Sequence, residues 1–265
     1  METFLGGKDN FSDFWFNKLT PRQRKRRIEL AFIPIKIVGM NQIHILEKYE
    51  KSSVFKEIGF IYFITTLKNT WDNIEFAIEI GKGRFRRFSY YPTRTVLESL
   101  LRLEYYCRQK KEGQNKITVR ELLRIAKRFY DREKIENQSG EPYRKMYSEV
   151  ADQGDYPQIE EANSKDDPFP NMKCLSKEST LCCDGNIYFS YEALCELSHG
   201  KLLAVTSAMQ DEFAEHIRSL MDIQYAACNL IKLVDNHIQG VTKKDVVEAL
   251  NKADRIIKDG FCEIL

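Results

Sequence analysis

The chain has 265 residues, of which 43% are hydrophobic and 30% are charged, and its formal net charge is +2. This balance is typical of an ordinary globular protein of one large domain or two small ones. The net charge is too small to identify a nucleic-acid binder, so bulk charge carries no such argument and only local basic clusters can.

Seven cysteines are spread without regular spacing, and the first residues lack the basic stretch followed by an apolar run that opens a signal peptide. Reduced thiols in the cytoplasm are therefore the expectation. No apolar run approaches the roughly 18 residues that a membrane span needs, so we also expect no membrane partner.

Helix signals begin near the start of the chain. Thr20-Pro21 predicts an N-cap and first helical residue, while Pro34 predicts a kink or break before helix resumes through about Glu50. A second helix is predicted over Val54–Ile80, with Gly81 directly after its end.

Two more helices are expected next. Pro92 predicts the start of a third helix, which ends at Gly113. Thr118 and Glu121 have the spacing of a capping box, which predicts the start of a fourth helix running to about Asn137.

Regularity is lost over residues 138–187, where turn-forming residues are frequent and one short helix is predicted near Tyr143–Val150. Helix then resumes after Ser190, with a break near Ser207, and a last amphipathic helix begins at Thr242. Strand patterns and repeats are lacking. The sequence thus predicts one all-α domain over the whole chain, a bundle of about six helices with a long irregular insertion.

Polar residues interrupt the apolar stripes of two of these helices. Arg94 and Glu98 are neighbours four residues apart in the third helix, and Glu104 falls within its apolar stripe. On the helix after residue 190, Ser198 lies within the stripe and His199 lies at its edge. Burying such groups unpaired costs about 1–3 kcal/mol each, so we expect the two sets to face each other.

Two interpretations of this cluster remain open. It could be a structural cluster, a buried Arg–Glu pair with a hydrogen-bonded histidine, that fixes the register of two helices. It could instead be a site, in which Glu98 orients the His199 imidazole and Arg94 binds phosphate. In that second interpretation, His199 is the general acid–base of a catalytic reaction.

The segments PTRTVLESLLRLEYY and YEALCELSHGKL resemble a family of bacterial helical domains of unknown function. The family pattern is an Arg and a Glu at the start of one helix and a Tyr–Ser–His run on a later one. The residues that match this pattern here are Arg94, Glu98, Tyr191, Ser198 and His199.

That family is similar in outline to the HEPN group, many of whose members are metal-independent ribonucleases of toxin and antiviral systems. The resemblance implies an all-helical fold and ribonuclease chemistry. The HEPN signature places an Arg four to six residues before a His, whereas the nearest Arg upstream of His199 is Arg144. Catalysis would therefore need Arg94 to supply the cation from another helix.

A basic segment lies directly before the third helix, where KGRFRRFSYY interleaves Arg84, Arg86 and Arg87 with aromatic residues. Guanidinium groups that bind phosphates and rings that stack on bases suit single-stranded nucleic acid. The alternative is a solvated helix start with its aromatic residues tucked into the core.

Metal-ligand spacings such as paired Cys-x-x-Cys or His-Glu-x-x-His are missing, and so are nucleotide-binding glycine loops. The sequence therefore predicts no metal and no cofactor. Two hypotheses follow: a binder of RNA or another phosphate-bearing ligand with ribonuclease activity, and a non-catalytic interaction module that dimerises or binds another protein. Whether the chain is an enzyme is left open.

Overall fold

The structure is a computed structural model that describes residues 20–51, 58–82, 86–136, 139–151, 156–163, 165–180, 191–196 and 212–237. Within these ranges the chain forms helices, turns and irregular connections and no strand, which confirms the predicted all-α class. No helix in the described ranges has an apolar stretch long enough to cross a bilayer.

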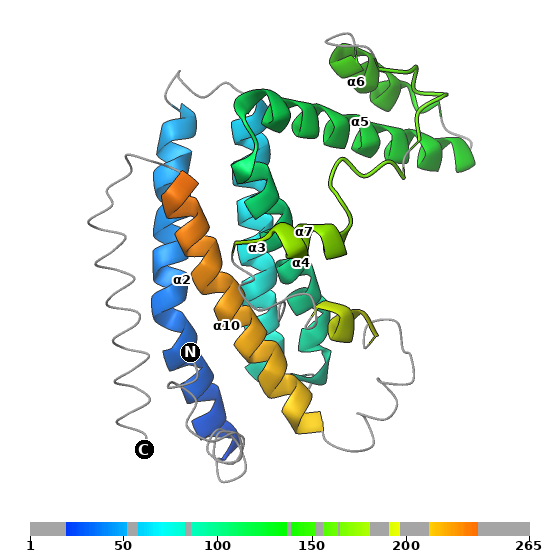
Figure 1. The fold of residues 1–265 in the computed structure, drawn as a ribbon. Coiled ribbons are helices and arrows are strands. Elements are labelled where there is room, and N and C mark those ends of the chain that lie inside the picture. Colours follow the sequence, from blue (N-terminus) through cyan, green and yellow to red (C-terminus); the bar gives the residue numbers. More distant parts are fainter. Residues whose placement is uncertain are drawn as a thin grey trace.

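Four long helices form the main bundle: α2 (Pro21–Lys51), α3 (Ile58–Lys82), α4 (Tyr90–Arg108) and α10 (Glu212–His237). α3 packs between α2 and α4, and α10 lies across all three (Figure 1). A single-turn 3-10 helix, η4 (Arg86–Ser89), leads directly into α4.

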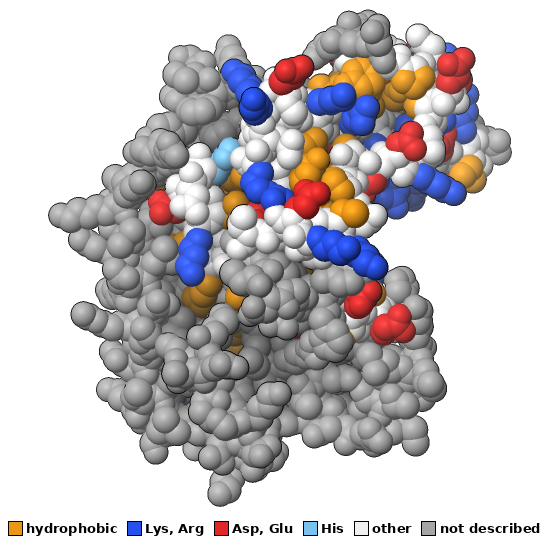
Figure 2. Space-filling view, in the orientation of Figure 1, with side chains coloured by type: hydrophobic (Ala, Val, Ile, Leu, Met, Phe, Trp, Pro, Cys, Tyr) orange, Lys and Arg blue, Asp and Glu red, His pale blue; other side chains and the backbone are white. Residues whose placement is uncertain are grey.

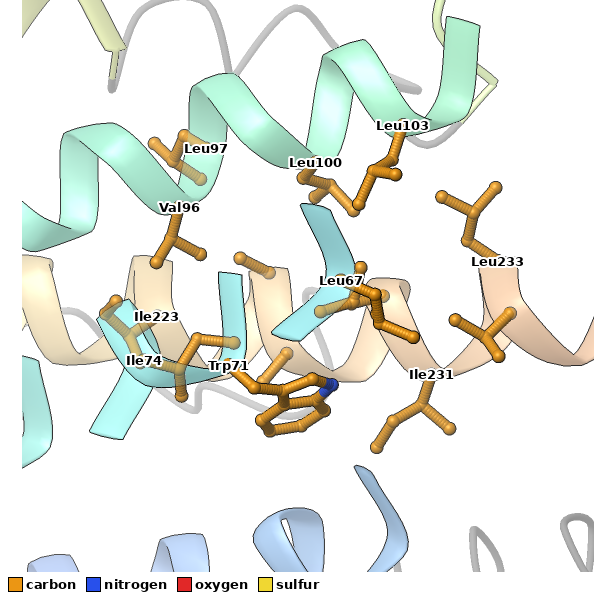
Figure 3. Packing of buried hydrophobic residues seen from close by; sticks show 14 of the residues in the cluster. Leu67, Trp71, Ile74, Val96, Leu97, Leu100, Leu103, Ile223, Ile231 and Leu233 are labelled. Atoms are coloured by element: carbon orange, nitrogen blue, oxygen red, sulfur yellow. The ribbon is translucent and has the colours of Figure 1, made fainter. Parts of the chain in front are cut away.

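The core of the main bundle is built mostly from aliphatic side chains of these helices, together with aromatic residues such as Phe63, Trp71 and Tyr106 (Figure 3). Burying one such side chain contributes about 1.5–3 kcal/mol, so the shared core is the main source of the bundle's stability. The labelled examples come from three helices: Leu67, Trp71, Ile74, Val96, Leu97, Leu100, Leu103, Ile223, Ile231 and Leu233.

Close approach of α2 and α3 depends on one glycine. The Trp71 ring lies so near Gly39 that a Cβ added there would be 2.0 Å from the ring carbon Cζ2. Only a residue without a side chain allows the indole to sit flat against α2. Nearby, the buried Gln42 side chain donates to the backbone oxygen of Ile231 at 3.0 Å, which ties α2 to α10.

A second, smaller unit projects from the main bundle. α5 (Lys111–Ile135) leaves the end of α4 at a steep angle, and α6 (Glu141–Ala151) packs along it (Figure 1). We call α5, α6 and residues 156–162 the α5–α6 unit. It has its own cluster of buried residues: Leu123, Ala126, Tyr130, Tyr147 and Ile159.

The chain then returns to the main bundle through a short helix, α7 (Met172–Glu178), which packs on α4. Asn171 caps α7 because its side-chain oxygen accepts from the backbone N–H of Cys174 at 3.0 Å. Residues 191–196 are helical, and Leu194 joins the core of the main bundle.

Several predicted helix boundaries were wrong. α2 runs through Pro34 without a break, and α3 includes Gly81 and ends at Lys82. The third helix ends at Arg108, five residues before Gly113, because Gln109 and Lys110 have extended backbone angles. Neither residue is a helix breaker, so no sequence signal marks this corner.

The capping box predicted at Thr118 and Glu121 was also wrong. Both residues lie inside α5, where the Thr118 hydroxyl donates to the Gln114 carbonyl one turn earlier. The fourth helix ends at Ile135, close to the expected Asn137.

Within the predicted insertion at 138–187, the short helix at 143–150 is confirmed as α6, whereas no sequence pattern indicated α7. The predictions made at Val54, Ser190, Ser207 and Thr242 lie outside the described residues.

Candidate functional site

Arg94 lies in the first turns of α4 and reaches the helical segment that begins at Tyr191. Its guanidinium carbon stands 5.7 Å from the centroid of the Tyr191 ring, a cation–π arrangement. Two segments almost a hundred residues apart in sequence are therefore in contact. The structure brings together the first element of the predicted site and the tyrosine of the second.

The environment of this pair keeps Arg94 charged. Burial alone would lower the pKa of Arg94, but the polar contact with Tyr191 and the nearby Cys195, Tyr191 and Glu98 groups raise it above its ordinary value. Burial also raises the pKa of Tyr191, and contact with Cys195 acts in the same direction. At neutral pH the pair is thus a cation resting on an uncharged phenol.

An open depression of about 430 Å³ lies beside this pair, between α3 and α4. Two aromatic side chains on its rim are unusually exposed, Phe76 at 58% and Tyr91 at 48%. Exposed rings next to a guanidinium offer both stacking surfaces and a positive charge. The residues that line the depression are Asn73, Phe76, Tyr91, Pro92, Arg94, Thr95 and Glu98.

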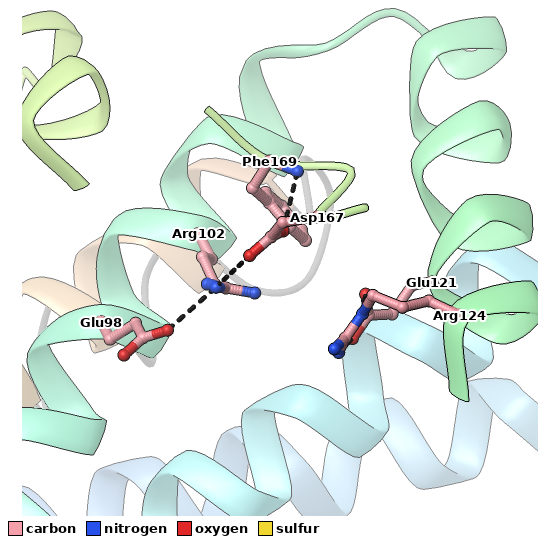
Figure 4. A network of polar contacts seen from close by, with 6 residues as sticks. All are labelled: Glu98, Arg102, Glu121, Arg124, Asp167 and Phe169. Carbon is pink, nitrogen blue, oxygen red and sulfur yellow. Dashed lines mark hydrogen bonds and ion pairs between the residues drawn. The ribbon is translucent and has the colours of Figure 1, made fainter. Parts of the chain in front are cut away.

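Glu98 does not pair with Arg94 as the four-residue spacing predicted. Its carboxylate accepts from Arg102, at 2.9 Å, and Arg102 also binds Asp167 at 2.6 Å (Figure 4). Asp167 in turn accepts from the backbone N–H of Phe169 at 3.0 Å. None of the ion pairs formed within the described part of the chain includes Arg94, so its charge has no carboxylate partner there.

Glu104 is buried, at 2% exposure. One carboxylate oxygen accepts from the Ser179 hydroxyl, and the other accepts from the Thr180 N–H at 2.6 Å and its hydroxyl at 2.8 Å. Glu104 thus fixes the segment that follows α7 to the side of α4. Its predicted position opposite Ser198 and His199 stays a prediction, because those two residues lie outside the described residues.

Five other predicted site residues are not placed with side chains. Ser198, His199 and Arg84 lie outside the described residues. Arg86 and Arg87 belong to η4, so their backbone directly precedes α4, and only that backbone is described. The predicted meeting of Arg94 and Glu98 with His199 therefore stays a prediction.

Three of the four aromatic residues of the basic segment are described, and they differ in burial. Phe88, Tyr90 and Tyr91 form a ring cluster, with the Tyr90 and Tyr91 centroids 4.5 Å apart. Tyr90 packs against the core of the main bundle, whereas Tyr91 faces solvent. The cluster therefore has one ring packed on the core and one exposed ring.

Thiol and metal chemistry find little support in the described ranges. Burial, together with the Glu104 carboxylate, raises the pKa of Cys107 to about 12, which keeps this thiol protonated and unreactive. No group of three or more His, Cys, Asp or Glu side chains in the described residues could hold a metal ion. The Cys182–Cys183 pair lies outside those residues.

Sequence reasoning missed three contributors to this region: Phe76, Arg102 and Asp167. Arg102 follows Glu98 by four residues, so the helical spacing contained a signal for that pair. Asp167 is 65 residues further along the chain and Phe76 is on another helix, and no local pattern links either to α4.

The chain matches no known family model, no curated protein and no solved structure. The geometry of the site therefore carries the functional argument alone.

Proposed function

We propose that this chain binds single-stranded RNA at the depression between α3 and α4. The observation that carries the proposal is Arg94, a cation without a carboxylate partner in the described residues, set on the Tyr191 ring beside exposed Tyr91 and Phe76. A phosphate accepts from the guanidinium while a base stacks on a rim aromatic.

Direct contact with RNA is tested by fluorescence anisotropy with a labelled single-stranded oligoribonucleotide. Arg94→Gln should weaken binding about tenfold or more, since a hydrogen bond to a charged group contributes roughly 1.5–3 kcal/mol. Tyr91→Ala should weaken it by about 1–3 kcal/mol through lost stacking. Both side chains are at the surface of the bundle, and circular dichroism checks that each variant folds.

The matched control is Arg128→Gln, which removes an exposed arginine of α5 that does not line the depression. This variant should bind RNA like the unmodified protein, apart from a small uniform loss at low salt. Equal binding by Arg94→Gln, Tyr91→Ala and Arg128→Gln would contradict the proposal.

The catalytic form of the proposal assigns metal-independent RNA cleavage to this site. His199 acts as general acid–base, Glu98 orients it, and Arg94 stabilises charge on the phosphate. The Glu98 oxygen Oε1 is held by Arg102, which fixes the carboxylate at the rim. Incubation of RNA in EDTA beside a His199→Ala variant tests this step, and equal RNA integrity in both samples would remove it. We place this activity in the bacterial cytoplasm, in a defence or toxin setting.

A second candidate function is a homodimerising interaction module, favoured by an exposed apolar stripe on α2. Ile33, Ile37 and Met40 repeat at helical spacing and are 49%, 56% and 44% exposed. Two copies of such a stripe can pair about a two-fold axis. Light scattering of the protein and of Ile37→Glu tests this candidate, and a monomer in both samples would reject it.

A further inference from the structure

A second concave site lies on the other side of the Glu98–Arg102–Asp167 network, between α5 and residues 156–168. The cavity measures about 510 Å³. Arg120, Arg124 and Lys127 enter it from one face of α5, because they repeat at four and three residues. Lys165 enters from the opposite wall.

Each carboxylate in or beside this cavity has a partner within the protein, although the partner of Asp166 is a neutral amide. Asp167 is held by Arg102, and Asp166 accepts from the Asn163 side chain at 2.9 Å. Glu121 accepts from Arg124 Nε at 2.8 Å, and Asp131 pairs with Lys127 at 2.8 Å.

Two of the four cations are left without such partners. Arg120 and Lys165 form no ion pair with any described residue, and they stand on opposite walls of the cavity. Figure 2 shows Lys and Arg side chains over α5 and the segments beside it, interspersed with Asp and Glu. An anion between the two walls would meet a cation from each side.

We propose that this cavity binds a phosphate ester of nucleotide size, with the phosphate held between Arg120 and Lys165. The volume is in the range typical of small-molecule sites, and it exceeds what a bare inorganic anion needs. Besides the cations, the polar residues Asn163, Asp166 and Asp167 line the cavity. The rest of the lining is apolar or aromatic and suits the body of a nucleotide: Leu123, Tyr147, Tyr156, Pro157, Ala162 and Pro168.

The phosphate ester could come from a free nucleotide or from the 5′ end of an RNA, and the test includes both sources. Isothermal titration compares AMP with adenosine, and a short 5′-phosphorylated oligoribonucleotide with its 5′-hydroxyl form. Binding should require the phosphate in at least one of these two pairs. The pair in which it does so identifies the source.

The double variant Arg120→Gln/Lys165→Gln should weaken that binding at least about tenfold, because two charge-assisted contacts are lost. Arg120 and Lys165 are exposed, so their loss should leave the fold intact. The matched control Arg128→Gln/Lys145→Gln removes two exposed cations of the same unit that lie outside the cavity. It should keep full affinity.

Three results would overturn the inference: no saturable binding of either phosphorylated probe, equal binding of probes with and without phosphate, or equal loss in both double variants. This inference goes beyond RNA binding at Arg94. The variants that test the two sites share no residue, and Arg128 serves only as a control position in both, so loss of binding at one site is distinguishable from loss at the other.

Discussion

The main bundle and the α5–α6 unit are held together by different kinds of contact. The bundle buries a large aliphatic core between four helices of 19 to 31 residues. The hydrophobic cluster of the α5–α6 unit has five buried residues, and two of them are tyrosines with engaged hydroxyls. Tyr147 donates to the Pro157 carbonyl at 2.9 Å, and Tyr130 accepts from Arg144 at 3.0 Å.

Cations reinforce the second unit. Lys127, Lys134 and Arg144 each stand within 6 Å of the Tyr130 ring centroid, at 5.6, 5.4 and 5.6 Å. Contacts of this kind contribute about 0.5–1 kcal/mol each at exposed sites, less than a buried aliphatic side chain does. We therefore expect the α5–α6 unit, which lines much of the 510 Å³ cavity, to open locally while the bundle remains folded.

The largest expected effect comes from Trp71→Ala in the main bundle. Truncating a buried tryptophan should lower the free energy of unfolding by about 3–5 kcal/mol, because the cavity it leaves refills only in part. Urea denaturation measures the loss. Hydrogen exchange should show faster global exchange in α2, α3 and α10, with the local opening of α6 unchanged. Equal acceleration in α6 would contradict the separation of the two units.

Next in size is Gly39→Ala. A methyl group there would clash with Trp71, and overpacking of this kind costs about 1–3 kcal/mol. Alanine's higher helix propensity offsets about 1 kcal/mol, so a net loss of stability is expected. Gly113→Ala in α5 is the matched control: its new Cβ would stand 3.2 Å from the Cβ of Gln109, a contact that a shift of a few tenths of an ångström relieves, at a partly exposed position near the start of α5. That variant should be neutral or stabilising, and thermal melts of both would decide the matter.

A smaller effect is expected from Tyr147→Phe in the α5–α6 unit. The ring stays, but the Pro157 carbonyl loses its donor, which should cost about 0.5–1.5 kcal/mol. The loss should be local: α6 amides should exchange faster while the urea midpoint of the bundle stays in place. A shifted bundle midpoint would mean that the two units unfold together.

How much of this could be predicted from the sequence depends on the range of the interaction. Apolar periodicity correctly indicated the long helices and the intrusion of Glu104 into an apolar stripe. The partners of Glu104 could not be predicted, because Ser179 and Thr180 lie some 75 residues away and follow a helix that no pattern indicated. The predictions based on Gly113 and Thr118 were wrong for the opposite reason. Their local signals were strong, but packing determined the boundary, and the chain turns between α4 and α5 at Gln109.

In the candidate site, too, short-range features could be predicted from the sequence and long-range contacts could not. Helical spacing made Arg94 and Glu98 candidates, and a resemblance added Tyr191, which the structure places against Arg94. The same four-residue spacing also favoured an Arg94–Glu98 pair, which the structure does not form. Arg102 is an equally close neighbour of Glu98 along the helix, and Asp167 holds Arg102 in place. The basic cavity was not predicted at all, since its walls come from α5 and from a turn-rich segment some 40 residues later.

The smallest effect is a pH dependence that belongs to the bundle alone. His237 ends α10 with its ring centroid 4.9 Å from that of Phe63, and burial lowers its pKa below the ordinary 6.5. Between the ordinary and the lowered pKa, the unfolded chain binds more protons than the folded one, so stability falls as pH drops through that window.

His237→Gln should flatten this slope in urea denaturation measured from pH 7 downward. The α5–α6 unit contains no histidine, so exchange of α6 amides, corrected for the intrinsic rate, should not follow the same slope. A slope that persists in His237→Gln would assign the titration to another group. A slope shared by α6 would show that the two units are coupled more tightly than their separate cores indicate.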